Sequence, residues 1–367
     1  MPIPPLTAQF RARGIRLGRI EERAAETPLS FGDVRAEQRA ARCAAGVFDF
    51  SFMGCFEVAG PEVAAYLARL QTRDLAQLAP DRLAYTLLLR DDGTVMIDAT
   101  VWRLGPNRFR VVTGRRSDID HLRAVAADFR VAIEDASERC GVIAVQGPNS
   151  AQLLVRCGAG RMPPRFGFAR ARLLGRDCTV ARVGYTGELG YEVFIDPAHA
   201  AELWEGLVAA GRALGVIECG LEAVDALRIE AGFILFAREL ALPVTPYEIG
   251  CGRLVGPQGL FLGARALAGR CRRTQSRILA GLVPSEWNPD MGDDVPAPPS
   301  APPQKGAGIV TSLAYSALFE RKIALGFVNP CDRYPGTRVR VQGGLRAAVT
   351  RLPFYDPVKR RARSPQS

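Results

Sequence analysis

The chain of 367 residues and 39.7 kDa is too long for one small core and is expected to form two or three domains. Hydrophobic residues make up 48% and charged residues 23% of it, which is typical of a globular and not of a disordered protein. The net charge of +10 comes from scattered arginines without an aromatic-interleaved basic patch, so a nucleic-acid-binding module is not expected.

Membrane insertion, secretion and metal binding are also not expected. No apolar run approaches the ~20 residues that cross a bilayer, and prolines and arginines interrupt the first 19 residues, which argues against a signal peptide. The nine cysteines are spread without a Cys-x-x-Cys pair and the histidines number two, whereas a metal cage needs clustered ligands. We therefore expect a soluble, cytoplasmic protein without a metal, whose cysteines are buried free thiols.

The N-terminal part of the chain carries helix and strand signals. The segment up to about residue 46 is amphipathic and partly helical, and residues 55–58 are expected to form a short strand. Gly60 and Pro61 open a helix, with Pro61 near its first position, where its missing N–H costs nothing. One apolar stripe at helical spacing follows: Val63, Tyr66, Leu67 and Leu70.

A hairpin and further strands and helices follow in chain order. Residues 83–89 and 94–102 flank Asp91-Asp92-Gly93, a hairpin turn signal. Asp196 and Pro197 cap and start a helix that runs to about residue 214. The other elements expected before residue 232 are strands at 108–113, 141–145, 178–183 and 191–195, and helices from about 117 and over about 221–231.

The C-terminal part changes in composition. Residues 284–303 hold seven prolines and are expected to form a loop, and residues 308–351 have the short strands of a small β-barrel. The expected order is two α+β regions within residues 1–275 and then a small β module within residues 276–357. A basic tail over 358–367 follows, which we expect to be solvated and disordered.

Asp98 is the most informative residue of the hairpin. Side chains alternate between the two faces of a strand, so Asp98 shares its face with Met96, Thr100 and Trp102. These neighbouring side chains are largely apolar, and a buried charge without a partner is strongly unfavourable. A ligand donor or an arginine is therefore expected near Asp98; the alternative is a surface strand that faces water.

Tyr85 is expected on the same face of the hairpin as Asp98. An even-numbered loop centred on residues 91–93 places the two residues opposite or diagonal to one another, unless a bulge intervenes.

Two further charged residues stand in unusual positions. Glu192 lies mid-strand after the glycine-rich loop 184–190, which allows close backbone approach to a ligand but also fits any tight hairpin. Arg228 lies on an apolar helical stripe, four residues after Val224. Its alternatives are a place in a binding site and an ion pair with Asp225, three residues before it.

The chain resembles the aminomethyltransferase (glycine cleavage T-protein) superfamily in a set of short motifs. They occur in the family's order between about residues 30 and 357, and the ordered set is specific although each motif alone is weak. They are Phe-Asp-Phe-Ser-Phe-Met-Gly at 48–54, the hairpin at 85–98, Val-Gln-Gly-Pro at 145–148, Gly-Tyr-Thr-Gly-Glu-Leu-Gly-Tyr-Glu at 184–192, Ala-Leu-Arg-Ile-Glu-Ala-Gly at 226–232, Gly-Ile-Val-Thr-Ser at 308–312, Ile-Ala-Leu-Gly-Phe-Val at 323–328 and Pro353-Phe354.

The resemblance implies a three-domain cloverleaf around a central folate funnel. Its parts would be a folate-binding region of two interleaved α+β domains over residues 1–275 and a C-terminal β-barrel domain over residues 276–357. The resemblance also implies tetrahydrofolate as the cofactor and Asp98 as the catalytic residue, which also binds the cofactor beside its nitrogens. Tyr85 and Tyr185 match the pocket tyrosines, Glu192 the pterin-binding carboxylate and Arg228 the arginine of a conserved motif. A carboxylate suits a pterin because its two oxygens accept parallel N–H bonds from the aminopyrimidine edge.

Three positions depart from the glycine-cleavage T-proteins. The histidine of their Asp-Val-Ser-His-Met motif is Phe52 here, their Asp-Asp pair is Ile97-Asp98, and their Leu-Tyr-Gly is Leu235-Phe236-Ala237. These changes weaken the case for a lipoyl-protein partner. The motifs look closer to the folate domains of dimethylglycine and sarcosine dehydrogenases and to tetrahydrofolate-dependent demethylases.

The function that the resemblance implies is tetrahydrofolate-dependent one-carbon transfer. A methyl or methylene group would move between a small N-, O- or S-methylated substrate and folate N5, with a proton from Tyr185, Asp98 or water. One alternative is a glycine-cleavage-type aminomethyltransferase. Another is a non-catalytic folate-binding accessory protein of iron–sulfur maintenance, although the chain lacks that group's Lys-Gly-Cys-Tyr motif. The chain has no Gly-x-Gly-x-x-Gly motif, so a separate flavoprotein or a carrier protein is a possible partner.

Overall fold

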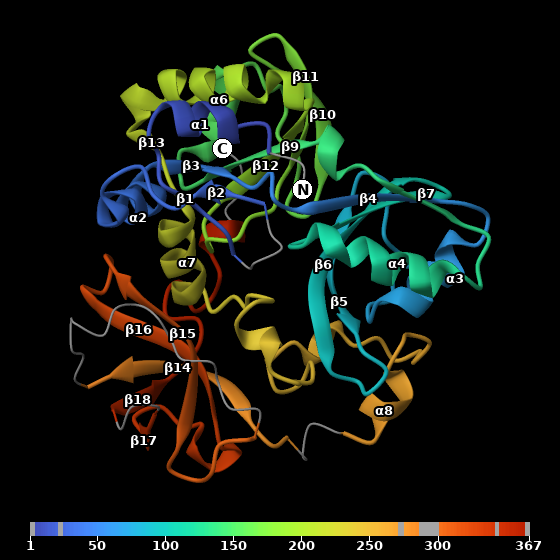
Figure 1. Cartoon of the computed structure of the whole chain (residues 1–367), viewed down its shortest axis with the longest axis vertical. Helices are drawn as coiled ribbons and strands as arrows, with labels where there is room; N and C mark the ends of the chain where they lie inside the picture. Colours follow the sequence, from blue (N-terminus) through green and yellow to red (C-terminus); the bar gives the residue numbers. More distant parts are fainter. Residues whose placement is uncertain (1–3, 21–24, 271–274, 286–300, 342–344, 364–367) are drawn as a thin grey trace.

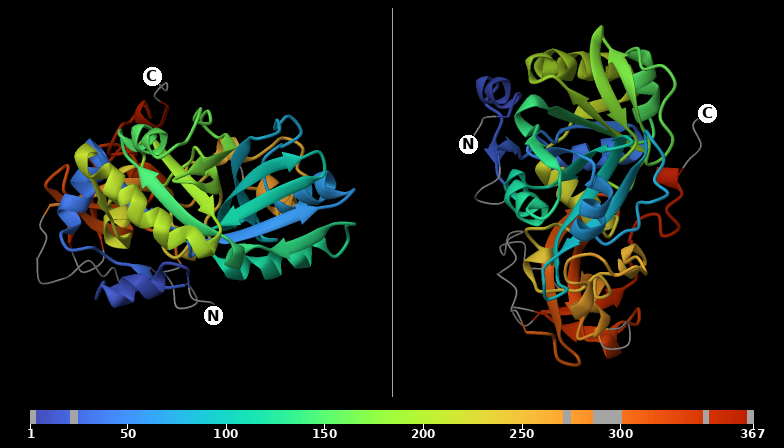
Figure 2. Two further views of the ribbon diagram at one scale, coloured as in Figure 1. Left: turned by 90° about the horizontal axis from the view of Figure 1, so that it is seen from above. Right: turned by 90° about the vertical axis from the view of Figure 1, so that its right-hand side faces the viewer.

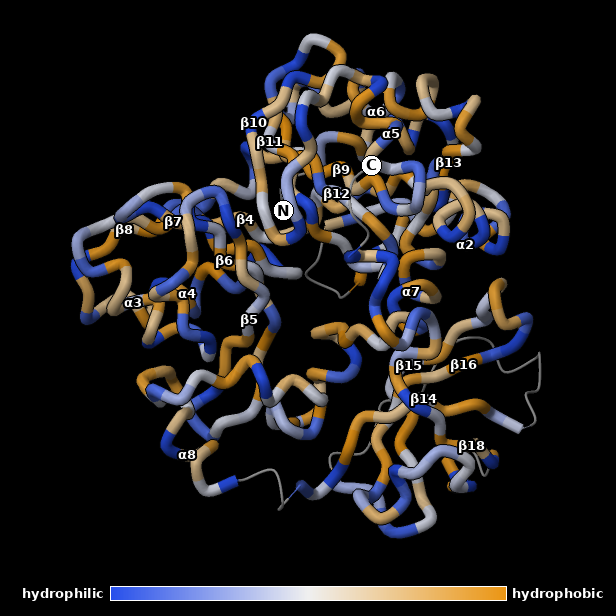
Figure 3. Tube along the Cα trace, turned by 180° about the vertical axis from the view of Figure 1, so that it is seen from behind, coloured by the Kyte–Doolittle hydropathy of each residue, from blue (hydrophilic) through white to orange (hydrophobic). Residues whose placement is uncertain are grey.

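Three sheet-centred lobes surround a common centre in the computed structural model of the chain (Figure 1). It describes residues 4–20, 25–270, 275–285, 301–341 and 345–363. The two described ends of the chain lie on opposite faces of the molecule (Figure 2). Apolar residues are concentrated along the strands of the three lobes (Figure 3). No helix in the described part of the chain is long and apolar enough to cross a membrane.

The first lobe is a five-stranded antiparallel sheet in the order β5-β6-β7-β4-β8. Helices α3 (Val63–Leu70) and α4 (Ile119–Ala126) pack their apolar stripes against one face of it, so that Tyr66, Leu67 and Leu122 share a core with Leu87 and Ile97. The strands are β4 (Gly54–Ala59), β5 (Leu83–Leu89), β6 (Val95–Gly105), β7 (Arg108–Thr113) and β8 (Ala132–Asp135).

The second lobe is a six-stranded sheet in the order β10-β11-β12-β9-β3-β13. Its strands are β3 (Ala45–Asp49), β9 (Gly141–Gln146), β10 (Phe168–Leu173), β11 (Arg176–Ala181), β12 (Gly190–Ile195) and β13 (Val216–Glu218). Residues of α1 (Thr7–Ala12), α5 (Ser150–Arg156) and α6 (Pro197–Gly211) share one core with it, and residues of α2 (Val34–Cys43) and α7 (Leu221–Glu230) share another. β3 precedes and β9 follows the strands of the first lobe, so the two lobes are interleaved along the chain.

The third lobe is a five-stranded barrel in the order β15-β16-β14-β18-β17. An isolated bridge between Ala307, next to β15, and Arg340, at the end of β17, joins the two outer strands. α7 links this lobe to the second one, because Ala226 and Ile229 pack against Ala314 and Leu325. The strands are β14 (Ile278–Pro284), β15 (Gly308–Ser316), β16 (Arg321–Val328), β17 (Arg338–Arg340) and β18 (Arg346–Thr350).

Smaller elements connect the lobes. β1 (Leu17–Gly18) and β2 (Thr27–Pro28) form a two-stranded sheet, and α8 (Ala264–Ala268) precedes the barrel. Short 3-10 turns lie at Arg116–Asp118, Ser137–Arg139, Arg212–Leu214, Glu239–Ala241, Gly252–Leu254, Pro330–Asp332 and Arg361–Arg363.

The predicted α+β cloverleaf with a C-terminal barrel is confirmed, and one helix start is corrected. Helix α3 begins at Val63 with Glu62 at its N-cap, so Pro61 lies in the preceding turn and not at the first helical position. The four-residue stripe of this helix is buried as predicted. Pro284 belongs to β14, and residues 286–300 of the proline-rich segment lie outside the described residues.

The basic tail packs against the body of the protein as far as residue 363, which contradicts the predicted disorder there. Lys359 Nζ lies 5.5 Å from the centre of the Phe233 ring, and Arg182 Nη2 donates to the Ala362 carbonyl at 3.4 Å. Cation–π attraction and this hydrogen bond offset the repulsion between the basic side chains. Residues 364–367 lie outside the described residues.

Two cysteines are also placed differently from the expectation of buried thiols. Cys43 and Cys331 are exposed, whereas Cys55, Cys157, Cys178 and Cys219 are buried; Cys271 lies outside the described residues.

Candidate active site

A cavity of about 360 Å³ lies where the three lobes meet. The first lobe contributes β5, β6 and the end of β7, the second lobe contributes β12 and α7, and the third contributes β15. All five residues that the sequence predicts for the site line it: Tyr85, Asp98, Tyr185, Glu192 and Arg228. Most of the remaining wall is apolar, and a concave apolar cavity with a few converging polar groups is the usual form of a small-molecule site.

Tyr85 and Asp98 meet inside the cavity as the hairpin predicts. The Tyr85 hydroxyl donates to Asp98 Oδ2 at 3.0 Å. Tyr85 pairs with Thr100, which stands two residues from Asp98 on the same face, so the contact is diagonal. A bulge at Met96 does intervene in the ladder, but it lies between this pair and the turn and leaves both side chains on one face. The alternative of a face directed into water is wrong.

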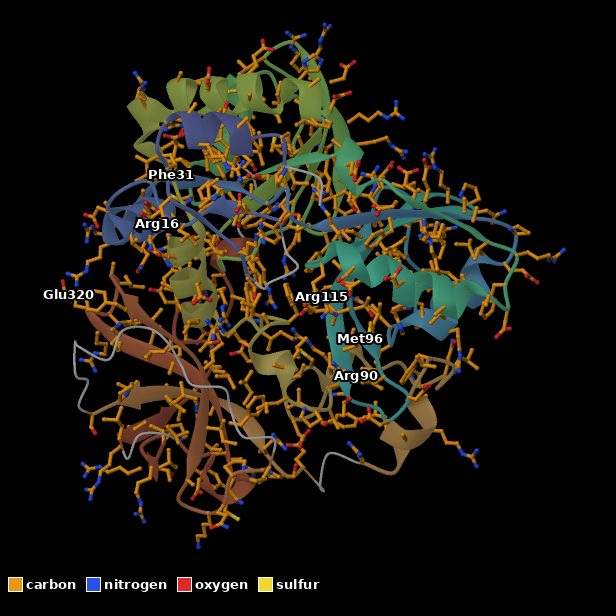
Figure 4. All side chains as sticks on the ribbon, viewed as in Figure 1. Arg16, Phe31, Arg90, Met96, Arg115 and Glu320 are labelled. Atoms are coloured by element: carbon orange, nitrogen blue, oxygen red, sulfur yellow. The ribbon has the colours of Figure 1, made fainter. Side chains whose placement is uncertain are left out.

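The environment of Asp98 favours its protonated form more than water does. Burial raises the pKa of Asp98 to about 6, the Tyr85 hydrogen bond lowers it, and the charges of Asp118 and Arg115 act in opposite directions. Burial also raises the pKa of Tyr85 and of Tyr185 well above 10, so both hydroxyls keep their protons. Figure 4 labels Met96, which lies in β6, and Arg115, which follows β7, at the side of the first lobe toward the centre.

Glu192 presents a buried carboxylate to the cavity. It stands in β12 between Ala144 of β9 and Ala181 of β11, and these two small neighbours leave room around it. The residue is 7% exposed, and within the described ranges its carboxylate has no hydrogen-bond or ion-pair partner. Burial alone raises the pKa of Glu192 to about 7. An unpartnered carboxylate here is unfavourable unless a ligand supplies donors.

This pKa has a measurable consequence for stability. The folded protein retains the Glu192 proton up to about pH 7 while the unfolded chain loses it near 4.5, so the free energy of unfolding falls as pH rises between these values. Glu192→Gln has no titrating group at this position and is not expected to show this fall in the free energy of unfolding. We expect the variant to gain roughly 3 kcal/mol relative to the wild type between pH 4 and pH 8, measured by urea unfolding at both pH values. An equal pH dependence in both proteins would contradict the assignment.

The glycine-rich loop before Glu192 packs on Gln146. A Cβ atom at Gly184 or Gly190 would lie 1.9 Å or 2.2 Å from Gln146 Oε1, so a larger residue at either position would have to displace the Gln146 side chain. Gln146 Oε1 in turn accepts a hydrogen bond from the Thr186 hydroxyl at 3.1 Å. The loop is thereby fixed, and it carries Tyr185 into the cavity.

Tyr185 is held by the segment that follows α7. Its hydroxyl donates to the Ile234 carbonyl, and its ring stacks on Phe233 with the centroids 5.9 Å apart and the planes at 23°. Both contacts fix the orientation of the ring at the cavity wall.

Arg228 lines the cavity and also links three segments of the chain through its hydrogen bonds. Its side chain is fully buried and donates to Asp225 Oδ1 at 2.8 Å, to Glu239 Oε2 at 2.9 Å and to the Phe233 carbonyl at 3.0 Å. A fourth bond runs to the Ser312 hydroxyl at 2.7 Å. The predicted ion pair with Asp225 therefore exists, and the guanidinium joins α7, the segment around Glu239 and β15. Cofactor contact by Arg228 stays a prediction.

Sequence reasoning missed several wall residues. Asp225, held by Arg228, lines the cavity with a side chain that is 35% exposed. Phe52 and Phe236, noted only as departures, line it too, and the Phe236 ring lies so close that a Cβ at Gly114 would be 2.5 Å away. Arg19 and Arg238 also line it. Their positions depend on how distant segments meet, for which the sequence has no local signal.

Within residues 4–20, 25–270, 275–285, 301–341 and 345–363, no group of three or more His, Cys, Asp or Glu side chains is arranged to hold a metal ion.

Known proteins match the chain over nearly its whole length. The GCVT N-terminal domain matches residues 8–258 and the Glycine cleavage T-protein C-terminal barrel domain matches residues 277–356. The aminomethyltransferase of Streptomyces coelicolor is 36% identical over 345 residues, which are 90% of this chain and 91% of that protein. The aminomethyltransferase of Thermus thermophilus is 37% identical over 343 residues, which are 90% of this chain and 93% of that protein.

A solved structure agrees with these matches. The glycine cleavage system aminomethyltransferase T from Bartonella henselae superposes with a TM-score of 0.81 and 25% sequence identity, over 97% of this chain and 98% of that one. The closer likeness to the folate domains of dimethylglycine and sarcosine dehydrogenases stays a prediction. The chain belongs to the aminomethyltransferase family of the glycine cleavage T-protein, and tetrahydrofolate is the cofactor of that family.

Proposed function

We propose that this chain is a tetrahydrofolate-dependent aminomethyltransferase, which transfers a one-carbon unit between an aminomethyl donor and the cofactor. Relatives that carry this name align with at least nine-tenths of the chain. The observation that carries the proposal is the pair of carboxylates in one cavity: Asp98 with a tyrosine donor, and Glu192 without a partner among the described residues.

The buried carboxylate of Glu192 and the apolar wall of the cavity support binding of a reduced pterin. The aminopyrimidine edge of a pterin presents adjacent N–H groups, and the buried carboxylate of Glu192 is the acceptor they match. Burial of an unpartnered carboxylate is then compensated when the ligand binds. The apolar wall around it suits the faces of an aromatic ring system. Tetrahydrofolate supplies the nitrogen atoms that carry the one-carbon unit.

Asp98 is the residue we assign to the chemistry. With a pKa of about 6 it is mostly ionised at neutral pH, and it then stabilises positive charge that develops beside it. The same pKa allows its carboxylate to take up or give a proton near neutral pH. The Tyr85 hydroxyl fixes the orientation of the carboxylate, which is a contribution of positioning. Arg228 contributes indirectly, because its hydrogen bond to Asp225 holds that residue at the cavity wall.

A second candidate donor is a small N-, O- or S-methylated molecule, which would make the protein a demethylase. The apolar side chains of Phe52 and Phe236 in the cavity wall favour it, because they suit methyl groups better than a polar arm. We propose a lipoyl-bearing carrier protein as the partner for aminomethyl transfer, and a separate flavoprotein as a partner for the second reaction. A non-catalytic folate-binding role predicts binding without turnover.

The experiment is a product assay by mass spectrometry of the folate pool. The protein and tetrahydrofolate are incubated under anaerobic conditions either with an aminomethylated lipoyl carrier or with a panel of methylated amines, ethers and sulfonium compounds. Methylene-tetrahydrofolate formed only with the carrier supports the first candidate, and methyl-tetrahydrofolate formed with a panel member supports the second. Folate binding without either product would contradict transferase activity. Asp98→Asn serves as the control with strongly lowered turnover.

A further inference from the structure

Two cysteines from different lobes face each other beside the cavity. Cys55 lies in β4 of the first lobe, and Cys140 directly precedes β9 of the second lobe. Their Sγ atoms are 3.8 Å apart and share a thiol hydrogen bond. The chain separation of the two residues is 85, so the fold and not the local sequence brings them together.

Only one of the two thiols is open to solvent. Cys55 is 1% exposed, and its backbone N–H donates to the Ser137 hydroxyl at 2.9 Å, which fixes it in place. Cys140 is partly exposed. A reagent in solution therefore reaches Cys140 first, and Cys55 lies behind it as the second thiol.

The charges around the pair favour a thiolate on Cys140. The hydrogen bond between the two thiols, followed by the positive charges of Arg110 and Arg139, lowers the pKa of Cys140 to about 7 against burial and Glu57. The same hydrogen bond raises the pKa of Cys55 well above its usual value. Arg110 is held in position by Glu57 Oε1 at 2.8 Å. Cys140 is the nucleophile and Cys55 is the resolving thiol of such a pair.

We propose that Cys55 and Cys140 form a thiol–disulfide exchange site for low-molecular-weight disulfides of the glutathione class, and that its oxidation cross-links the first and second lobes beside the cavity. To form a disulfide, the Sγ atoms need to approach from 3.8 Å to about 2.05 Å. β4 and β9 each pair with a strand that lines the cavity. Cys55 pairs across the sheet with Val112, which lines the cavity, and β9 pairs with β12 at Glu192.

The exchange balances in two steps. The Cys140 thiolate attacks one sulfur of the disulfide, a mixed disulfide forms, and one equivalent of small thiolate leaves and takes up a proton. The Cys55 thiol then loses its proton and attacks the Cys140 sulfur, which releases the second equivalent of small thiol. The protein loses two electrons and two protons, and the small disulfide gains them.

The test uses the full-length protein with oxidised glutathione, followed by peptide mapping under non-reducing conditions. The wild type is expected to yield one peptide that links residues 55 and 140, with two equivalents of reduced glutathione released per cross-link. Cys55→Ser is expected to stop at a glutathione adduct on Cys140. Cys140→Ser is expected to leave Cys55 unmodified. Circular dichroism verifies that each variant is folded.

Cys43→Ser is the matched control, because Cys43 is exposed and no other described thiol is recorded in contact with it. This variant is expected to cross-link residues 55 and 140 as the wild type does. A stable adduct on Cys140 in the wild type, without the cross-link, would overturn the proposal. So would an unmodified Cys140 under conditions in which Cys43 and Cys331 react.

Discussion

Replacing Asp98 by asparagine is expected to lower the turnover number about 100- to 1,000-fold, the loss typical when one electrostatic contact to the reacting group is removed. Asparagine keeps the size of the side chain and an oxygen that accepts from Tyr85, but it has no negative charge and takes up no proton. The dissociation constant of tetrahydrofolate is expected to change much less than the turnover number. Both are measured on the same preparation, by product assay and by calorimetry.

The pH dependence separates a chemical from a structural role of Asp98. The wild-type rate is expected to fall as pH drops through about 6, because the Asp98 carboxylate becomes protonated. The rate of Asp98→Asn is expected to show no such fall near pH 6. Tyr85→Phe is the companion variant. It removes the hydrogen bond that lowers the pKa of Asp98, so the fall is expected to shift to higher pH. A wild-type turnover number in Asp98→Asn would contradict the role assigned to this residue.

Replacing Arg228 by methionine is expected to lower the free energy of unfolding by about 3–5 kcal/mol, because removal of one partner leaves the other charge buried and uncompensated. Arg228 and Glu239 both have fully buried side chains and contact each other at 2.9 Å. The Phe233 carbonyl and the Ser312 hydroxyl also lose their donor. Urea unfolding followed by circular dichroism measures the effect.

Arg176→Met is the matched control for this prediction. Arg176 pairs with Glu202 at 2.8 Å, similar to the distance in the buried pair, but the two side chains are 39% and 57% exposed. Its loss is expected to cost about 1 kcal/mol or less. A loss in Arg228→Met no larger than that of the control would mean that the buried network does not hold the lobes together.

The part of the site that follows from strand periodicity could be predicted from the sequence. Alternation along β6 places Asp98 opposite the core-facing residues, and the hairpin register brings Tyr85 to it, even with the bulge at Met96. Helical spacing likewise places Asp225 beside Arg228. These relations involve neighbours within one element or one hairpin, so local geometry determines them.

The contacts between lobes could not be predicted in this way. Glu239 and Ser312 reach Arg228 from segments 11 and 84 residues away, and no spacing rule relates them. The same holds for the two thiols at positions 55 and 140. The basic composition of the tail led to the expectation that it lies in solvent. Lys359 instead lies over the ring of Phe233, and the composition of the tail gives no indication of this aromatic contact.

The most direct test of the account is an anaerobic calorimetric titration of the folded protein with tetrahydrofolate. We expect the wild type to bind one equivalent, and Glu192→Gln to bind with an affinity about ten- to a hundredfold weaker. Hydrogen bonds to a charged group contribute about 1.5–3 kcal/mol, and the variant loses the charge that accepts them. The absence of measurable binding by well-folded wild-type protein would contradict the central claim that this cavity is a tetrahydrofolate site.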